Sequence, residues 1–478
     1  MNVPKTALID IITRYFAMLK ELFLFLIALE ISTGSTFAVS DPRQHPNNKV
    51  GINSLSPDAE IAEASSLVNN GGDWGWVVIV VKKDERNLDR WQSVLDQATK
   101  RHLIPIIRLA TTFDQKGYWQ KPTDEDAKDW AGFLSRLYFP TKNRYVQVYN
   151  EVNRAAEWGG TVDAAGYAKE LNKTVDALKA KSSEFFVLNA PLDLALNDSA
   201  SSLNAQTFYQ TMAATVPKIF TRIDGWASHS YPNPDFSSSP YKSGRTSIDG
   251  YIWELSQIAS NTDNKDLPVF ITETGWKRNT SSVPGLSEDQ ISKYYETAFN
   301  NIWNDKKVVA VAPFVFDYPE QLFNQFSFKA DEKIVGKKYY DYFFAIKDLA
   351  KTKGEPEREN SAADFTINLP GYIIKGERNS INIEIKNTGN YIWNPKANLH
   401  LVSTSSKVSI KQISWEKDEV YPGQNIKGKI EVSSKDLGTW QTKTEVKDGN
   451  KVLAIKDVSI DSETYLSLFF KAFKSFFD

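Results

Sequence analysis

The sequence predicts an α/β fold, a (β/α)8 TIM barrel followed by a small all-β sandwich, and two observations carry this prediction. Between residues 49 and 351, short apolar runs rich in β-branched and aromatic residues alternate with segments of helix length. Between residues 364 and 461, helical patterns stop and apolar residues recur at every second position. Eight βα repeats in roughly 300 residues favour a closed parallel barrel over an open doubly wound sheet.

Eight apolar segments are predicted to be buried parallel strands, because they are short, continuous and bounded by polar residues. They are residues 50–55, 74–81, 104–110, 145–149, 185–190, 225–230, 269–272 and 308–316. The predicted helices follow them at residues 58–69, 88–102, 124–137, 164–181, 205–215, 248–260, 288–304 and 339–351. Ser56 before Pro57, and Ser287 three residues before Gln290, are typical helix N-caps. The first βα turn lacks a Gly-x-Gly-x-x-Gly loop, so we expect no dinucleotide cofactor.

A charged linker is predicted at residues 352–363, and the β-sandwich at residues 364–461. Ile381, Ile383 and Ile385 alternate with polar residues, as in a strand with one buried face. Turn residues recur often enough for six to eight short strands. The segment Asn-Thr-Gly-Asn-Tyr-Ile-Trp-Asn-Pro at residues 387–395 resembles the opening hairpins of immunoglobulin-like accessory modules. Such a module either binds a target or acts as a spacer.

Both ends of the chain carry possible attachment signals. Residues 1–40 predict a signal peptide or an N-terminal membrane anchor, because basic residues precede an uncharged run at 22–29 and small residues surround Ala38. We therefore expect a secreted or cell-surface protein. Residues 462–478 predict an amphipathic helix with Leu466, Phe469, Phe470, Phe473 and Phe477 on one face. This helix either lies on a membrane surface or partner, or covers an apolar patch of the protein.

Composition excludes several classes of function. The 57 basic and 59 acidic residues leave a net charge of −2, which gives no global field for nucleic acid. The absence of cysteine removes disulfides, thiolate metal sites and thiol nucleophiles. The four histidines have no metal-ligand spacing, so we predict neither a metal site nor a cofactor.

Two glutamates stand at the ends of predicted strands. Glu151, in Val-Tyr-Asn-Glu-Val-Asn, follows the fourth strand, and Glu273, in Phe-Ile-Thr-Glu-Thr-Gly-Trp, ends the seventh. The carboxyl ends of all strands of a parallel barrel meet on one face, where such barrels carry their chemistry. Two opposed carboxyl groups are what glycoside hydrolysis needs, and 13 Trp, 20 Tyr and 27 Phe supply rings on which sugars stack.

These residues resemble clan A of the retaining glycoside hydrolases, where an asparagine precedes the acid/base on strand four and the nucleophile lies on strand seven. Asn150-Glu151-Val152-Asn153, with Trp158-Gly159-Gly160 and Tyr167-Ala168, is similar to family 39, family 5 and bacterial exopolysaccharide hydrolases, although many relatives have proline in place of Val152. The resemblance implies that Glu151 is the acid/base and Glu273 the nucleophile. It also implies that Asn150 binds the sugar 2-hydroxyl and that Tyr231 donates a hydrogen bond to the nucleophile.

Other candidate substrate-binding residues follow from their positions. Arg108 ends the third strand, where its positive charge would keep the nucleophile ionised, or it bridges layers of the barrel. His229 follows the sixth strand and either packs there or contacts substrate. Trp158 and Trp276 adjoin the two glutamate motifs and are predicted to stack on sugar rings.

The sequence thus predicts a carbohydrate-active enzyme that cleaves β-linked poly- or oligosaccharide by double displacement. We expect a carboxyl separation of about 5–5.5 Å and environments that push the two pKa values apart, with Glu151 protonated and Glu273 ionised. A barrel that binds glycans without cleaving them is the alternative, and another barrel chemistry, such as metal-assisted hydrolysis, is a third. The sugar, its linkage and endo or exo action do not follow from the sequence.

Overall fold

The computed structural model describes residues 39–358, 362–389 and 392–474. The predicted targeting segment, residues 1–40, therefore lies almost entirely outside the described residues. Among the helices of the described chain, none is both long enough and apolar enough to cross a membrane.

Residues 39–358 contain eight parallel strands, each within a few residues of its predicted position. They are β1 (Gly51–Ser54), β2 (Gly75–Lys82), β3 (Leu103–Ala110), β4 (Arg144–Gln147), β5 (Phe185–Leu188), β6 (Trp226–Ser228), β7 (Val269–Thr274) and β8 (Val308–Pro313). Neighbours pair in sequence order from β1 to β5 and from β6 to β8. Single bridges, Leu188 with Gly225 and Val50 with Val311, join the two arcs. The predicted (β/α)8 fold is confirmed.

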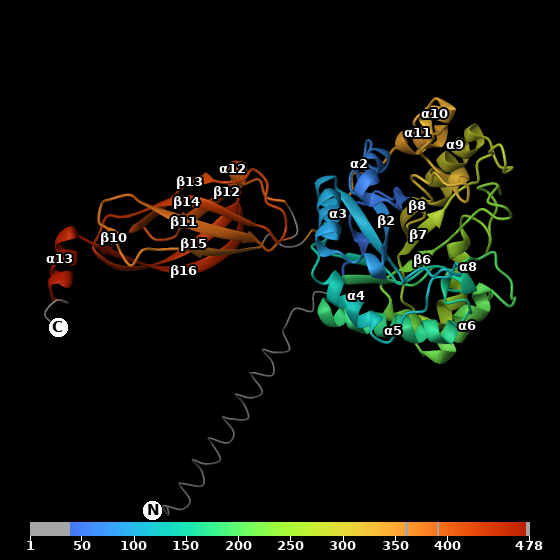
Figure 1. Cartoon of the computed structure of the whole chain (residues 1–478), viewed down its shortest axis with the longest axis horizontal. Coiled ribbons are helices and arrows are strands. Elements are labelled where there is room, and N and C mark those ends of the chain that lie inside the picture. Colours follow the sequence, from blue (N-terminus) through green and yellow to red (C-terminus); the bar gives the residue numbers. More distant parts are fainter. Residues whose placement is uncertain (1–38, 359–361, 390–391, 475–478) are drawn as a thin grey trace, which may run out of the picture. The chain divides into compact units, whose positions relative to one another are not determined.

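Helices surround these strands (Figure 1). They are α2 (Pro57–Val68), α3 (Leu88–Lys100), α4 (Asp126–Leu134), α5 (Ala164–Lys181), α6 (Ala205–Thr215), α7 (Ile219–Arg222), α8 (Gly250–Ile258), α9 (Glu288–Thr297), α10 (Glu332–Val335) and α11 (Asp341–Lys347). A π-helical segment, Ala298–Ile302, extends α9 through most of its predicted range. The Ser287–Gln290 capping box forms as expected, whereas the side chain of Ser56 makes no capping hydrogen bond. The short helices α7 and α10 were not predicted, because a single turn has no periodic pattern.

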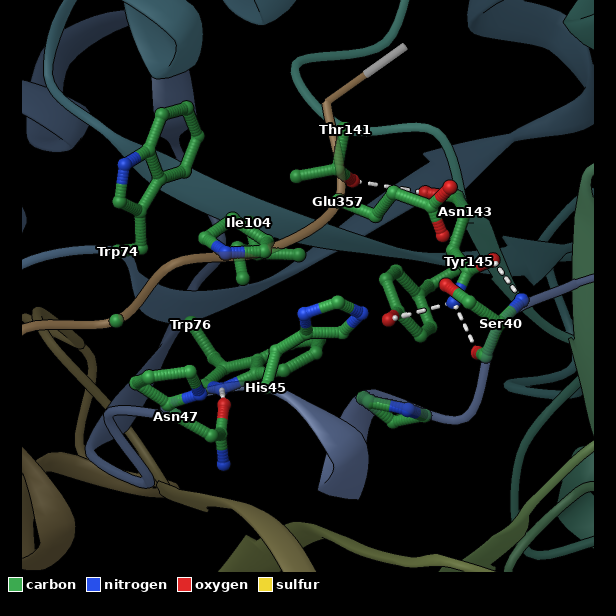
Figure 2. Close-up of a pocket in the computed structure, with 14 residues that line it drawn as sticks. Ser40, His45, Asn47, Trp74, Trp76, Ile104, Thr141, Asn143, Tyr145 and Glu357 are labelled. Atoms are coloured by element: carbon green, nitrogen blue, oxygen red, sulfur yellow. Dashed lines mark hydrogen bonds between the residues drawn. The ribbon is translucent and has the colours of Figure 1, made fainter.

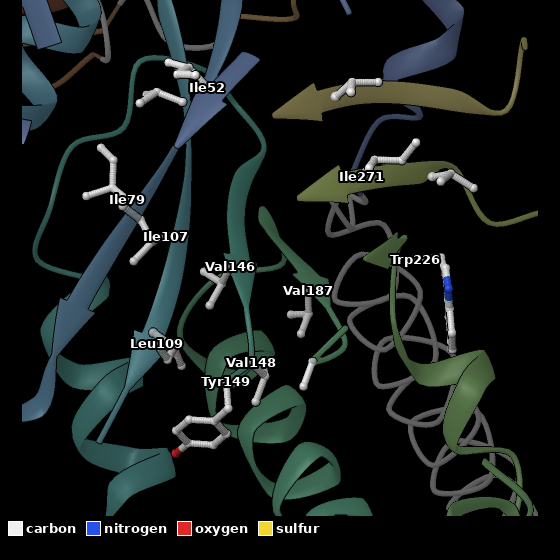
Figure 3. Close-up of a cluster of buried hydrophobic side chains, with 14 of the residues drawn as sticks. Ile52, Ile79, Ile107, Leu109, Val146, Val148, Tyr149, Val187, Trp226 and Ile271 are labelled. Atoms are coloured by element: carbon white, nitrogen blue, oxygen red, sulfur yellow. The ribbon is translucent and has the colours of Figure 1, made fainter. Parts of the chain in front are cut away.

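Barrel strands are buried on both faces, as their continuous apolar runs predict. Side chains such as Ile79, Ile107 and Val146 belong to the outer core beneath the helices (Figure 3). Those at alternate positions point inward, where Trp76, Tyr145, Phe186 and Phe270 form a cluster with ring centroids 4.9–5.6 Å apart. Each of these four is the second residue of its strand. Aromatic packing therefore fills the barrel at the amino ends of the strands.

A small cavity lies at this amino-terminal end (Figure 2). Trp76 and Tyr145 line it from the barrel, and Glu357 lines it from the segment after α11. Asn143 and Ser40 exchange two hydrogen bonds beside it, of 3.1 and 2.8 Å. Because parallel barrels carry their chemistry at the opposite end, we do not assign this cavity a function.

The first part of the predicted linker packs against the barrel. The backbone N–H of Gly354 donates to Asp73 O at 3.0 Å, and that of Glu355 donates to Pro46 O at 2.8 Å. The ammonium of Lys142 lies 2.7 Å from the carboxylate of Glu357. Residues up to 357 thus belong structurally to the barrel.

The second domain has two four-stranded sheets, with strand orders β10-β16-β15-β12 and β13-β14-β11-β9. Its elements are β9 (Ala363–Ile367), β10 (Ile373–Ile374), β11 (Asn379–Asn387), α12 (Pro395–Asn398), β12 (Leu399–Ser403), β13 (Val408–Trp415), β14 (Asn425–Ser434), β15 (Gly438–Asp448) and β16 (Lys451–Glu463). Ile381, Ile383 and Ile385 are buried in the core shared by both sheets, as their alternation predicts. All but one of the strand pairings are antiparallel, and the predicted all-β second domain is confirmed.

Helix α13 (Tyr465–Lys474) follows β16 directly, within the predicted amphipathic segment. Its apolar side chains are strongly exposed, from 67 % for Tyr465 to 55 % for Phe473. Phe469 contacts Phe470 and Phe473 of the same helix. This exposure contradicts the alternative that the helix covers an apolar patch of the protein. Phe477 lies outside the described residues.

Candidate active site

Glu151 is presented by a strained turn after β4. The backbone of Tyr149 has φ 71° and that of Glu151 has φ 34°, a left-handed conformation that residues other than glycine rarely adopt. The turn is held to the next strand, because the N–H of Val148 donates to Leu188 O at 3.1 Å and that of Glu151 to Pro191 O at 2.9 Å. Strain of this kind concentrates at functional sites, where the surrounding structure enforces it.

Glu273 lies on β7 itself, and buried polar side chains hold this part of the strand. Asn53, on β1, donates from Nδ2 to Thr272 O at 2.8 Å and to Ala312 O at 2.9 Å. Thr274 donates from its hydroxyl to Ser230 O at 2.7 Å. These hydrogen bonds tie β7 to β1, β8 and the segment after β6, so Glu273 projects from a rigid element.

The two carboxylates face each other across the top of the barrel. One oxygen of Glu151, one of Glu273 and a ring nitrogen of His229 all lie within 4.8 Å of one another. Glu273 is 8 % exposed, and Glu151 is half-buried.

Arg108 and Tyr231 are the direct partners of Glu273. The guanidinium of Arg108, from β3, donates to Oε1 of Glu273 at 2.7 Å, and the hydroxyl of Tyr231 donates to Oε2 at 3.1 Å. Burial, together with the charges of Glu273 and Glu151, raises the pKa of Tyr231 well above its ordinary value, so this hydroxyl stays a donor. Arg108 and Tyr231 thus each hold one oxygen of the Glu273 carboxylate.

His229 and Arg154 are the partners of Glu151. Nδ1 of His229 lies 2.9 Å from Oε1 of Glu151, and Nε of Arg154 lies 3.1 Å from Oε2. Arg154 also forms an ion pair with Asp193. Burial favours the protonated form of Glu151, but the hydrogen bond from His229 and the charges of His229, Arg154 and Arg108 outweigh it and lower the pKa of Glu151.

The pKa of His229 moves in the opposite direction. Burial lowers it, but the negative charge of Glu273 and the hydrogen bond and charge of Glu151 raise it above its ordinary value. These two shifts run against the expectation that burial keeps Glu151 protonated. His229 lies near both carboxylates, with Nδ1 2.9 Å from Oε1 of Glu151 and 3.7 Å from Oε2 of Glu273.

Several buried polar atoms around the two glutamates have no hydrogen-bond partner within the described chain. They include Oδ1 of Asn150, Nε2 of His229 and Nε of Arg108. Asn150 is 9 % exposed and lines a hollow beside the cleft. Buried polar groups are usually satisfied, so atoms like these mark places where a ligand would gain hydrogen bonds.

The two tryptophans predicted to stack on sugar do not face the cleft. Trp276 is 2 % exposed, donates from Nε1 to Ser238 O at 2.8 Å and packs against Tyr295. Trp158 is 3 % exposed and lies between Tyr149 and Tyr167, reaching only the hollow that Asn150 lines. A ring enclosed by protein offers no face to a sugar, so this geometry argues against both predicted roles.

A different set of aromatic residues lines the cleft. The cleft has a volume of about 420 Å³ and contains both glutamates. Its aromatic wall consists of Phe236, Phe314, Phe323 and Phe326. Sequence reasoning placed Phe316 at the end of the last strand, but β8 ends at Pro313 and Phe316 is fully buried. Phe236, Phe323 and Phe326 lie in loops far apart in the sequence. No local sequence pattern predicts that these loops come together.

Five charged residues of the cleft also escaped sequence reasoning: Arg154, Glu157, Asp193, Asp235 and Lys277. Arg154 and Glu157 follow Glu151 in the same turn, and their proximity to it in the sequence was the available signal. Lys277 reaches the cleft from the segment after β7 and lies 2.6 Å from Asp235. No spacing rule links this pair, because the two residues come from separate loops.

Glu151, His229 and Glu273 are also a set of donor atoms close enough for a metal ion. The guanidiniums of Arg108 and Arg154 already neutralise the two carboxylates at 2.7 and 3.1 Å. A divalent cation would meet these fixed positive charges. We therefore do not assign a metal to this site.

No protein-family profile and no curated protein sequence matches the chain. Among solved structures, the chain is similar to glycoside hydrolases. A family 128 (subgroup II) endo-beta-1,3-glucanase from Sorangium cellulosum has 14 % identity over 63 % of this chain and 98 % of its own, with a TM-score of 0.41. A family 39 glycoside hydrolase from Bacteroides cellulosilyticus has 14 % identity over 83 % of both chains, with a TM-score of 0.44. A beta-mannanase from Thermomonospora fusca, solved with mannotriose, has 15 % identity over 64 % of this chain and 91 % of its own, with a TM-score of 0.40. At these identities the likeness concerns the fold only.

Proposed function

We propose that the protein is a retaining glycoside hydrolase that cleaves β-linked poly- or oligosaccharide. The observation that carries the proposal is the meeting of Glu151 and Glu273, whose carboxylate oxygens approach within 4.8 Å from the ends of β4 and β7. Arg108 and Tyr231 contact Glu273, Arg154 contacts Glu151, and His229 lies near both, so the two carboxylates have different surroundings, which suits groups with different tasks. The aromatic cleft around them suits the apolar faces of sugar rings.

In the first step, Glu273 attacks the anomeric carbon and the glycosidic bond breaks. Arg108 and Tyr231 hold the attacking carboxylate in place. The leaving oxygen takes its proton from Oε of Glu151, and His229 supplies that proton through its 2.9 Å contact with Glu151. A glycosyl ester on Glu273 results.

In the second step, water hydrolyses this ester. Glu151 accepts the water proton and shares it with His229, while the sugar leaves with its original anomeric configuration. Asn150 lies beside Glu151 with an unsatisfied amide oxygen, and we assign it to the substituent at position 2 of the reacting sugar.

The configuration of the product tests this proposal. A panel of β-linked gluco-, manno-, xylo- and mixed oligosaccharides is incubated with the protein, and the first-formed anomer is read by proton NMR. We expect a β-anomer from at least one substrate. An α-anomer would overturn the retaining mechanism, and binding without any product would favour a non-catalytic glycan-binding barrel.

We propose further that α13 attaches the protein to a membrane surface, which agrees with a secreted or surface-associated location. Replacing Phe469 and Phe470 with aspartate is expected to weaken binding to phosphatidylcholine–phosphatidylglycerol vesicles at least about tenfold, because both rings are 60 % or more exposed and would enter the lipid. Vesicle flotation of the full chain measures this.

Ile413 and Ile455 are matched controls, because they are exposed on β-strands of the sandwich at 51 % and 54 %. Their replacement by aspartate should leave flotation unchanged. Equal flotation of the α13 variant and the parent protein would remove the proposed role. Light scattering without lipid tests another role. If the parent protein is a dimer and the α13 variant is a monomer, the helix binds a second copy of the chain instead of a membrane.

A further inference from the structure

Glu157 occupies a position that the proposed mechanism does not use. It ends the short 3-10 turn Ala155–Glu157, directly after the strained turn that presents Glu151. Its side chain is half-buried and lines the cleft that contains Glu151 and Glu273. It also lines the adjoining hollow, together with Asn150 and Trp119. Glu157 thus stands where the two spaces meet.

The other acidic residues of the cleft have basic partners. Glu273 pairs with Arg108 at 2.7 Å, and Arg154 pairs with both Glu151 and Asp193. Asp235 pairs with Lys277 at 2.6 Å. Within the described chain, no ion pair and no side-chain hydrogen bond is formed by Glu157. Its carboxyl group is therefore the uncompensated acid of the cleft.

The surroundings of Glu157 make this carboxyl responsive to a ligand. Burial raises its pKa to about 7, with Arg108 and Arg154 opposing the rise and Glu151 and Glu273 adding to it. An ionised carboxylate at this place lacks both full solvation and a counter-ion. A ligand cation would supply the missing charge, whereas a ligand carboxylate would be repelled by it.

We propose that Glu157 binds the ammonium group of an amino sugar and directs the site to β-linked substrates containing 2-amino-2-deoxyhexose with a free amine. The inference rests on the proposed function in one respect, since it uses the assignment of Asn150 to the substituent at position 2. Asn150 and Glu157 line the same hollow, so an ammonium at that position meets the carboxylate. Acetylation of the amine removes the charge and with it the attraction.

Binding to an inactive full-length protein tests this inference without requiring turnover. Titration calorimetry near neutral pH compares β-1,4-linked oligomers of glucosamine, N-acetylglucosamine and glucose, all with the Glu273→Gln protein. Adding Glu157→Gln is expected to weaken glucosamine-oligomer binding about tenfold or more, because a charge-assisted hydrogen bond is lost. Affinity for the two uncharged oligomers should change less than about threefold.

Asp235→Asn is the matched control, because it removes a carboxylate of the same cleft that Lys277 already neutralises. It should not weaken the glucosamine oligomer selectively.

The outcomes separate this inference from the proposed function. Equal loss for all three oligomers, or no loss for the glucosamine oligomer, would overturn the role of Glu157. Selective loss in a protein whose wild type hydrolyses no glycoside would support the role of Glu157 and overturn the proposed hydrolase. An unchanged unfolding temperature for Glu157→Gln shows that the comparison concerns binding.

Discussion

Replacement of Glu273 with glutamine is expected to abolish hydrolysis, with kcat at least about 10⁴-fold lower on any substrate that the wild type cleaves. Glutamine keeps the shape of the side chain but cannot form the glycosyl ester. It also removes the negative charge that Arg108 and Tyr231 contact at 2.7 and 3.1 Å. Initial rates with the first active substrate of the glycoside panel measure the effect.

The matched control is Asp235→Asn, a neutralised carboxylate of the same cleft outside the proposed chemistry. It should lower kcat far less than Glu273→Gln. Incubation with an activated 2-deoxy-2-fluoro glycoside gives a second readout, because mass spectrometry should place the covalent sugar on the peptide containing Glu273. Full turnover by Glu273→Gln, or a label on another residue, would contradict the assignment.

Replacement of Glu151 with alanine is expected to lower activity most on substrates with poor leaving groups and least on substrates with good leaving groups. On natural oligosaccharides, where the leaving oxygen needs a proton, we expect a loss of about 10²–10⁴-fold. On aryl glycosides with acidic phenols the first step needs little help, so substantial activity should remain. Azide should then restore turnover of the glycosyl ester and yield a β-glycosyl azide, because a small anion fits where Glu151 was.

Equal loss on good and poor leaving groups, with no azide rescue, would rule out Glu151 as acid/base. The wild-type pH profile supplies a further check. Because the pKa of His229 is raised above its ordinary value, its imidazole keeps its proton to higher pH than a free histidine and loses it as the pH rises further. Activity on natural oligosaccharides should therefore fall on the alkaline side, and this limb should flatten for Glu151→Ala with activated substrates.

The architecture was largely predictable because it depends on local patterns. Strands such as β3 and β7 are continuous apolar runs with both faces buried, and helices such as α5 and α6 begin and end at the predicted residues. The eightfold alternation then implies a barrel, which places the ends of β4 and β7 on one face. This position, together with the motifs around Glu151 and Glu273, made the two residues candidates.

The sequence predictions were wrong where the role of a side chain depends on whether it is buried. Trp158 and Trp276 adjoin the glutamate motifs in the sequence, yet neighbouring aromatic side chains enclose both. The apolar face of α13 has the same amphipathic pattern whether it packs on protein or stays exposed, and only the structure distinguishes the two cases.

By itself, the sequence determined the order of strands and helices, the two-domain organisation and the pair of carboxylates, since each follows from periodicity or from position along a strand. The tertiary structure alone decided which partners surround each carboxylate. His229, Arg154 and Arg108 lower the pKa of Glu151 against the effect of burial, whereas burial raises the pKa of Glu157, which forms no ion pair among the described residues. Such differences depend on distances of a few ångströms between side chains from separate loops, and electrostatic interactions in a partly buried cleft change steeply over that range.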